Sequence, residues 1–129
     1  MSGGEIFLSA LAGLVLLLYA RQFLLKRSIK HYGPEELAQA MKGSTGILLV
    51  DVRTKAERQE NHIPGSIHLP LASIHFKGEE LERHKHQELV FYCASGNRSL
   101  RAAAIMRKKG YTVANLRGGI GEWNFYNRA

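Results

Sequence analysis

The single cysteine of the chain, Cys93, has neighbours that fit anion binding. It follows the apolar run 88–92, and small or turn-forming residues separate it from Arg98. Gly96 and Asn97 belong to the residue types that most easily adopt left-handed backbone angles, so the segment can curl with its N–H groups pointing inward. A concave ring of amides binds anions, and a helix starting near Arg98 adds its positive N-terminal end. The pattern therefore predicts an anion cradle beside the cysteine.

A thiol in this setting is expected to be reactive. Amides that face the sulfur stabilise the thiolate, which is the nucleophilic form of cysteine. The same donors would stabilise the terminal sulfur of a persulfide or the oxyanions of a sulfur donor. The alternative is an inert free cysteine, buried at the end of a core strand. A lone cysteine excludes a disulfide within the chain.

Two buried strands are predicted to carry polar residues to the same edge of a sheet. The apolar run 46–50 leads to Asp51, and the run 88–92 leads to Cys93. The other predicted elements are strands at 67–69 and 111–116, and helices at 34–42, 54–61, 71–76, 78–86, 98–109 and around Trp123. Strands that alternate with helices predict an α/β fold, in which helices cover both faces of a central parallel sheet. Ligands of such folds bind beyond the carboxyl ends of the strands.

An uncharged apolar stretch, Ile6–Ala20, precedes the predicted domain. It approaches the roughly 20 residues of a membrane-spanning helix if Arg21 is tolerated at its end. A cleaved signal peptide would carry its positive charges before the apolar run, whereas here they follow it. A helix lying at the membrane surface is a further alternative. We expect residues 1–30 to form a transmembrane anchor and a basic linker, which extends over 26–33, and residues 31–129 to form the domain.

The net charge of +7 is not evenly distributed. Residues 1–30 carry +3 and the remainder carries +4, so nearly half of the excess follows the apolar stretch. Anionic lipid headgroups attract basic side chains at that position, and the positive-inside rule places the domain in the cytoplasm. No aromatic residues interleave a basic patch elsewhere, so we expect no nucleic-acid partner. The histidines lack the spacing of zinc ligands, and we expect neither a metal nor a cofactor.

Three segments of the chain resemble, in the same order, the signatures of the rhodanese-like sulfurtransferase family. The similar segments are the cysteine loop Cys93–Ser99, an upstream group made of Asp51-Val52-Arg53, Glu57 and 62–67, and a C-terminal group made of 116–119 and Trp123. Together they extend over roughly residues 32–127. Asn61 stands where the family usually has glycine, and His68 where asparagine is common. Both departures lie outside the cysteine loop.

This resemblance implies a rhodanese-like fold and a cycle of sulfur transfer. Cys93 would take sulfane sulfur from a small-molecule or protein donor, hold it as a persulfide and pass it to a thiophilic acceptor. The implied substrate-binding residues are Ala94, Ser95, Gly96, Asn97, Arg98 and Ser99. Asp51 and Arg53 would support the loop from the neighbouring strand.

Two other functions are compatible with parts of the pattern. Phosphatases of the related cell-cycle dual-specificity type also use a cysteine and an arginine on one loop. Four residues separate Cys93 from Arg98, one fewer than in those enzymes, and the smaller loop suits a single sulfur atom better. The other alternative is a non-catalytic binding module at the membrane, although such modules commonly lose the cysteine.

Overall fold

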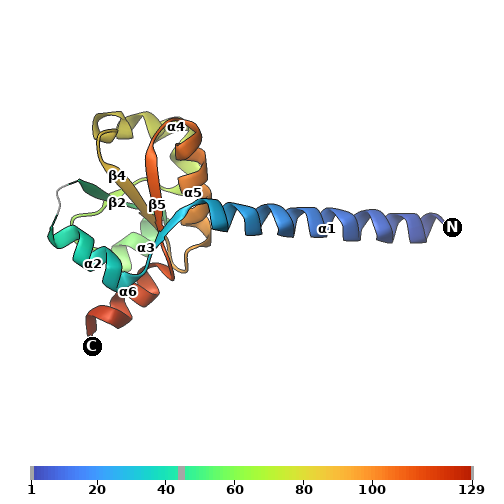
Figure 1. Cartoon of the computed structure of the whole chain (residues 1–129), viewed down its shortest axis with the longest axis horizontal. Coiled ribbons are helices and arrows are strands. Elements are labelled where there is room, and N and C mark those ends of the chain that lie inside the picture. The colour runs from blue at the N-terminus through green and yellow to red at the C-terminus, as the bar shows by residue number, and fades with distance from the viewer. Residues whose placement is uncertain (1, 44–45, 129) are drawn as a thin grey trace.

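A five-stranded sheet lies between two layers of helices, and one long helix extends away from them (Figure 1). The structure is a computed structural model that describes residues 2–43 and 46–128. Its elements, in chain order, are α1 (Gly3–Ser28), β1 (Lys30–Tyr32), α2 (Pro34–Lys42), β2 (Ile47–Asp51), α3 (Lys55–Glu60), β3 (Ile67–His68), η1 (Leu71–Ser73), α4 (Ile74–Lys77), η2 (Gly78–His84), β4 (Glu88–Tyr92), α5 (Asn97–Lys108), β5 (Thr112–Leu116) and α6 (Gly119–Arg128).

The sheet is parallel, with the strand order β1-β5-β4-β2-β3. Strand β4 is central, and its neighbour β2 pairs with it so that Asp51 lies beside Tyr92. Cys93 is the next residue after Tyr92, so it lies at the same carboxyl edge as the end of β2. The α/β class, the parallel sheet and the shared edge predicted from the sequence are thereby confirmed.

The residues of β4 alternate between two cores, because successive side chains of a strand point to opposite faces. Leu89, Phe91 and Cys93 belong to the core that includes the buried face of α5. Val90 and Tyr92 belong to the core that includes residues of α2 and α6. Both faces of the sheet are therefore buried, which explains why the sequences of the central strands are unbroken apolar runs.

The predicted linker over residues 26–33 is wrong. Helix α1 continues to Ser28, and Lys30–Tyr32 forms the edge strand β1, which pairs with β5 from Lys30 beside Ala114 onward. Ile29, between helix and strand, is buried in the core. A strand of three residues is too short to show a hydrophobic periodicity. It is defined by its pairing with β5, about 80 residues later in the chain, which the local sequence does not indicate.

The two helices predicted over residues 71–86 take a tighter form. Most of this stretch is 3-10 helix, in η1 and η2, with the short α4 between them. Helix η2 buries only Gly78 and Leu81, which are three residues apart. Residues at that spacing align on one side of a 3-10 helix, so the tighter turn is enough to bury both.

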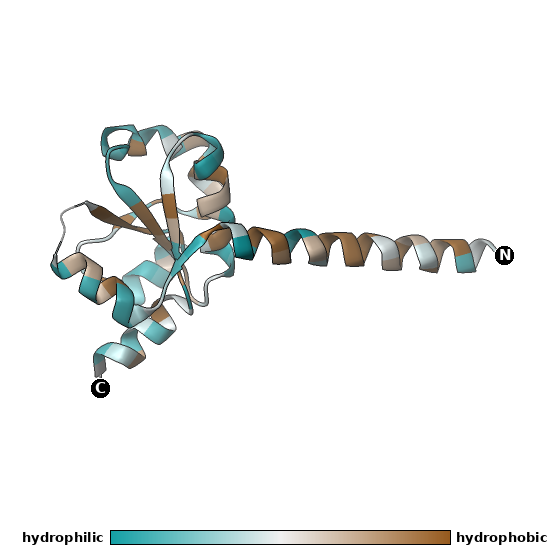
Figure 2. Cartoon of the chain, in the orientation of Figure 1, coloured by the Kyte–Doolittle hydropathy of each residue, from teal (hydrophilic) through white to brown (hydrophobic). Residues whose placement is uncertain are grey.

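Helix α1 exposes its apolar side chains. None of its residues is buried, and Figure 2 shows hydrophobic residues along most of its length. A capping box between Ser2 and Glu5 begins the helix, with Ser2 accepting from the Glu5 amide and Glu5 accepting from the Ser2 amide. Within the described residues, α1 is the one helix long and apolar enough to cross a membrane, although a signal sequence would meet the same criteria.

Candidate functional site

The cysteine loop is a tight turn from the end of β4 into α5. Gly96 precedes the first residue of α5 and has a φ of +112°, a left-handed value that glycine adopts without steric cost. Asn97, which the sequence also assigned to the flexible part of the loop, is instead the first helical residue of α5. No non-glycine residue in the described ranges has a positive φ. The turn therefore depends on Gly96 alone for its reversal.

Donors surround the sulfur of Cys93 inside this turn. The amide of Gly96 donates to Sγ at 3.0 Å, and the Ser99 hydroxyl lies 3.3 Å from it. Burial raises the pKa of the Cys93 thiol, but hydrogen bonds from the Ser99 hydroxyl and from the amides of Ser99, Gly96 and Ser95 outweigh burial and leave the pKa below its ordinary value. The cysteine is only 1% exposed. A buried sulfur with this many donors is suited to carry negative charge.

A chain of hydrogen bonds extends from this sulfur to the end of α1. Ser99 Oγ lies 2.6 Å from Asn115 Oδ1 and 3.3 Å from the sulfur, so its single proton is donated to Asn115 while Cys93 is a thiol and is available to the sulfur once Cys93 ionises. Asn115 Nδ2 lies 3.3 Å from His31 Nδ1. The other ring nitrogen of His31 lies 2.7 Å from the carbonyl oxygen of Lys26. Neither Asn115 nor His31 was predicted from the sequence. An asparagine between the apolar residues of strand β5 was the available signal, because a buried amide requires partners.

The glycine pair after β5 closes against the cysteine loop. The amide of Ile120 donates to the Cys93 carbonyl oxygen at 2.9 Å. Gly119 has a φ of +61°, and a Cβ there would lie 2.4 Å from that same carbonyl oxygen. Only glycine fits such a close approach of two backbones. The C-terminal Gly-Gly segment seen in the sequence thus has a physical role as the wall behind the loop.

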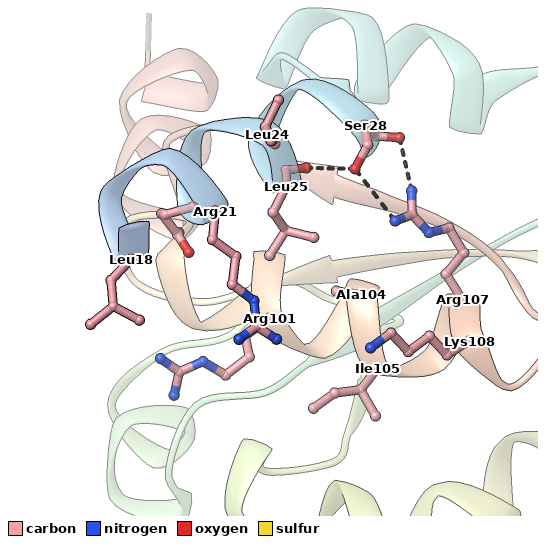
Figure 3. Close-up of a pocket in the computed structure, with 11 residues that line it drawn as sticks. Leu18, Arg21, Leu24, Leu25, Ser28, Arg101, Ala104, Ile105, Arg107 and Lys108 are labelled. Atoms are coloured by element: carbon pink, nitrogen blue, oxygen red, sulfur yellow. Dashed lines mark hydrogen bonds between the residues drawn. The ribbon is translucent and has the colours of Figure 1, made fainter. Parts of the chain in front are cut away.

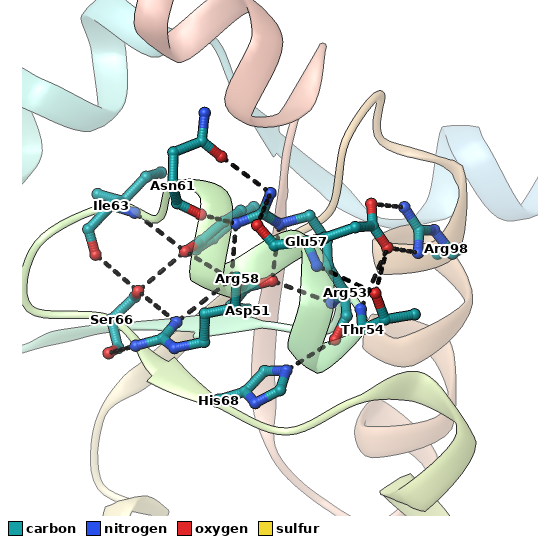
Figure 4. Close-up of polar contacts among 11 residues, drawn as sticks. Asp51, Arg53, Thr54, Glu57, Arg58, Asn61, Ile63, Ser66, His68 and Arg98 are labelled. Atoms are coloured by element: carbon teal, nitrogen blue, oxygen red, sulfur yellow. Dashed lines mark hydrogen bonds and ion pairs between the residues drawn. The ribbon is translucent and has the colours of Figure 1, made fainter.

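Arg98 does not contact the sulfur. Its guanidinium donates to both carboxylate oxygens of Glu57, at 2.7 and 2.8 Å, and links α5 to α3 (Figure 4). This pair lowers the pKa of Glu57 to about 2, and Thr54 adds to the shift through the predicted capping box. Arg98 thus pairs with Glu57, and the expectation that it binds the anion stays a prediction. Its charge still acts on Cys93 through space.

Asp51 and Arg53 form a buried ion pair at the end of β2 (Figure 4). Arg53 donates to both carboxylate oxygens at 3.0 Å, and Arg58 and the Tyr92 hydroxyl also donate to Asp51. Burial works to raise the pKa of Asp51, but the bonds from Arg53 and Tyr92 prevail and lower it. Asp51 is therefore held in its charged form, and each of these three side chains donates a hydrogen bond to it.

This network supports the segment after α3 more than the cysteine loop. Arg53 donates to the carbonyl oxygen of Asn61 at 2.6 Å. The Tyr92 hydroxyl accepts from the Ile63 amide and lies 2.9 Å from the Ser66 hydroxyl. The predicted support of the loop by Asp51 and Arg53 is thus indirect, through Tyr92, the residue that precedes the cysteine.

A small basic cavity lies against the outer side of the cysteine loop. It has a volume of about 220 Å³, and Ser95, Gly96 and Asn97 form part of its lining. Lys26, His31 and Arg117 line the rest together with Asn115. The loop is therefore bordered by the positive charges of Lys26 and Arg117 at this cavity.

The fold and the site define an α/β protein with a thiolate-stabilising loop at the carboxyl edge of its sheet. Residues 33–125 match the family described as Rhodanese-like domain. The chain belongs to this family. A sulfurtransferase of Allochromatium vinosum is 41% identical over 90 residues, which cover 69% of this chain and 82% of that protein. The thiosulfate sulfurtransferase GlpE of Pseudomonas syringae is 40% identical over 91 residues, covering 70% and 83%.

A solved structure from Rhodopseudomonas palustris has a similar fold. It superposes with a TM-score of 0.75 at 26% identity and covers 84% of this chain and 89% of its own. That protein is described as one of unknown function and a possible tyrosine phosphatase. The α/β rhodanese fold is therefore shared between proteins to which different chemistry is attributed.

Replacing Ser99 with alanine is expected to raise the pKa of the Cys93 thiol, because the ionised sulfur loses the hydrogen bond from the hydroxyl. Alkylation requires the thiolate, so its rate increases as the pH rises through the pKa. The midpoint of the rate of iodoacetamide alkylation against pH should then lie at higher pH in the variant. Ser95→Ala, which keeps its backbone amide, is the control. Equal midpoints for wild type and Ser99→Ala would contradict the role of the hydroxyl.

Replacing Asp51 with asparagine is expected to lower the free energy of unfolding by about 3 kcal/mol, because Arg53 is left buried without its counter-charge. Urea denaturation measures this loss. The control is Glu36→Gln, which removes the exposed pair of Glu36 with Arg117 at 3.7 Å and should cost less than about 0.5 kcal/mol. A variant Asp51→Asn as stable as the control would show that the network contributes no stability.

Proposed function

We propose that the chain is a sulfurtransferase that carries sulfane sulfur on Cys93. The thiolate attacks the outer sulfur of a donor of the thiosulfate or persulfide type. The sulfur–sulfur bond of the donor breaks, sulfite or a thiolate leaves, and Cys93 becomes a persulfide. A nucleophilic acceptor then attacks the terminal sulfur, and the thiolate is regenerated. The observation that supports this proposal most is the group of amide and hydroxyl donors around Sγ of Cys93.

The same donors suit each state of this cycle. A thiolate and the terminal sulfur of a persulfide both carry negative charge, and preorganised amides stabilise such charge at low cost. On this proposal the substrate site is the turn from Ala94 to Ser99. Arg98 contributes charge and anchors the turn through Glu57, and the basic cavity with Lys26 and Arg117 draws anionic donors to the loop.

The relatives agree with this chemistry. Two proteins about 40% identical to this chain are named as sulfurtransferases, and one of them is named as a thiosulfate sulfurtransferase. The phosphatase alternative has support from the Rhodopseudomonas palustris protein. Against it stands the engagement of Arg98 with Glu57, since a phosphatase of this type needs its arginine free to bind phosphoryl oxygens.

We also propose that α1 anchors the protein in a membrane, as a single span with the domain in the cytoplasm. Residues 1–30 would form the anchor and residues 31–129 the catalytic domain. The exposed apolar face of α1 supports the span, and the basic residues Arg21, Lys26 and Arg27 at its C-terminal end support the orientation. In this arrangement the sulfur site works close to the membrane surface.

Incubation with thiosulfate is expected to add one sulfur atom to the wild-type protein, and intact-mass spectrometry detects it. The variant Cys93→Ala should gain none, because it lacks the only thiol. A thiophilic acceptor such as cyanide should return the wild-type mass to its original value. A wild-type protein that gains no sulfur from thiosulfate or from a small persulfide would favour the binding module. Hydrolysis of a phosphate ester, lost in Cys93→Ser, would favour the phosphatase.

Full-length protein is expected to stay with membranes after carbonate extraction. Arginine near the middle of a span disfavours insertion by about 3 kcal/mol for each residue. The double variant Leu14→Arg/Leu17→Arg should therefore appear in the soluble fraction, whereas Leu14→Ala/Leu17→Ala should stay with the membrane. A wild-type chain that is soluble with an intact N-terminus would refute the anchor, and one that lacks its N-terminus would indicate a signal peptide.

A further inference from the structure

A groove with basic and apolar walls lies where α1 leaves the domain, between the last three turns of α1 and the outer face of α5 (Figure 3). Its volume is about 760 Å³. Leu25 of α1 and Ile105 of α5 contribute apolar surface to it, and Arg21, Arg101 and Lys108 contribute positive charge. The groove is separate from the cysteine loop and from every contact described above for the sulfur site.

The positive charge of the groove is not compensated. Among the residues that the structure describes, no acidic side chain lines the groove, and Arg21, Arg101 and Lys108 have no ion pair. Arg107, also in the groove, is already bound, since it donates to the carbonyl oxygen of Ser28 at 3.0 Å and so fixes α1 to α5. Three free cations around one hollow attract an anion.

The apolar walls restrict what that anion can be. On α1 the groove continues into exposed leucines, with Leu18 at 53% and Leu24 at 63% exposure. A soluble anion would leave this surface in water, and an acidic peptide would bring charge along the whole groove. An amphiphile with one anionic group and a hydrocarbon chain matches both the cationic side chains and the apolar walls of the groove. The combination therefore favours a lipid.

The orientation of the helices places the groove at the depth of the lipid headgroups. Figure 1 shows the axis of α5 running across the direction of α1, with α1 extending away from the domain beside it. If α1 crosses a membrane, α5 lies along the membrane surface. Arg21 directly follows the uncharged stretch Ile6–Ala20, so its guanidinium reaches the headgroup layer. Arg101 and Lys108 are two turns apart on the same face of α5 and complete the site.

We infer that this groove binds an anionic phospholipid, with the headgroup phosphate between Arg21, Arg101 and Lys108 and a chain along Leu25 and Ile105. The inference rests on the proposed anchoring by α1. Helix α5 begins directly after the cysteine loop, and Arg101 lies about one turn into it. A lipid in the groove therefore holds the domain against the membrane and keeps the sulfur site at the level of the headgroups.

The test uses full-length protein in detergent micelles with equal amounts of phosphatidylglycerol and phosphatidylcholine. Native mass spectrometry counts the lipid of each kind that remains bound. Wild type should retain phosphatidylglycerol preferentially, and Arg101→Gln/Lys108→Gln should lose that preference by about ten-fold or more, because each cation near anionic lipid contributes several-fold to binding. The control Lys42→Gln/Arg83→Gln removes the same charge from exposed residues outside the groove and should behave as wild type.

Several outcomes would overturn the lipid site. Equal retention of both lipids by wild type would show an apolar surface without a headgroup site. Displacement of phosphatidylglycerol by millimolar inorganic phosphate would show a site for soluble anions. A dimer that the double variant abolishes would show that a second copy occupies the groove. Failure of the anchor proposal is distinguishable, because it appears as carbonate-soluble wild type, whereas the double variant should stay in the membrane pellet and lose only its lipid preference.

Discussion

A sulfur atom that carries charge inside a protein needs donors to replace the water it has lost, and the position of Cys93 makes this the central constraint of the structure. Most of the donors are backbone amides, with the Ser99 hydroxyl beside them, so the requirement falls mainly on the shape of the turn. That shape needs a left-handed residue at Gly96 and a second backbone at contact distance, which Gly119 allows. The sheet supplies the remainder, because parallel pairing brings the ends of β2, β4 and β5 to one edge.

Polar contacts, not apolar ones, hold the element opposite the loop. Helix α3 buries none of its residues, so the usual packing term is missing. Two ion pairs hold the helix instead. Glu57 pairs with Arg98 of α5, and Arg58 pairs with the buried Asp51. The Asp51–Arg53 pair is almost fully buried, whereas both partners of the Glu57–Arg98 pair are about one-third exposed. The buried pair is consequently the structural one, and solvent screens the other.

The connection between α1 and the sheet leaves little freedom between the apolar helix and the sulfur site. The chain passes from Ser28 through the buried Ile29 directly into β1, and Arg107 binds the end of the helix from α5. A flexible linker would have let the domain rotate beneath its anchor. Here the direction of α1 and the position of the cysteine loop belong to one packed body, joined further by the hydrogen bonds from Ser99 through Asn115 and His31 to Lys26. If α1 spans a membrane, this rigid connection therefore fixes the orientation of the sulfur site relative to the membrane surface.

The sequence by itself determined what depends on neighbouring residues. Apolar runs located β2 and β4, the Thr54–Glu57 spacing located the start of α3, and glycine after the lone cysteine indicated the turn that cradles the sulfur. Only the tertiary structure decided the features that join distant segments. These are the edge strand β1 on β5, the capture of Arg98 by Glu57 instead of by the sulfur, the pairing of Ser99 with Asn115 and the groove between α1 and α5. Short-range patterns specify backbone shape through local sterics and hydrogen bonding, whereas a long side chain such as that of Arg98 chooses its partner only when folding brings the candidates together.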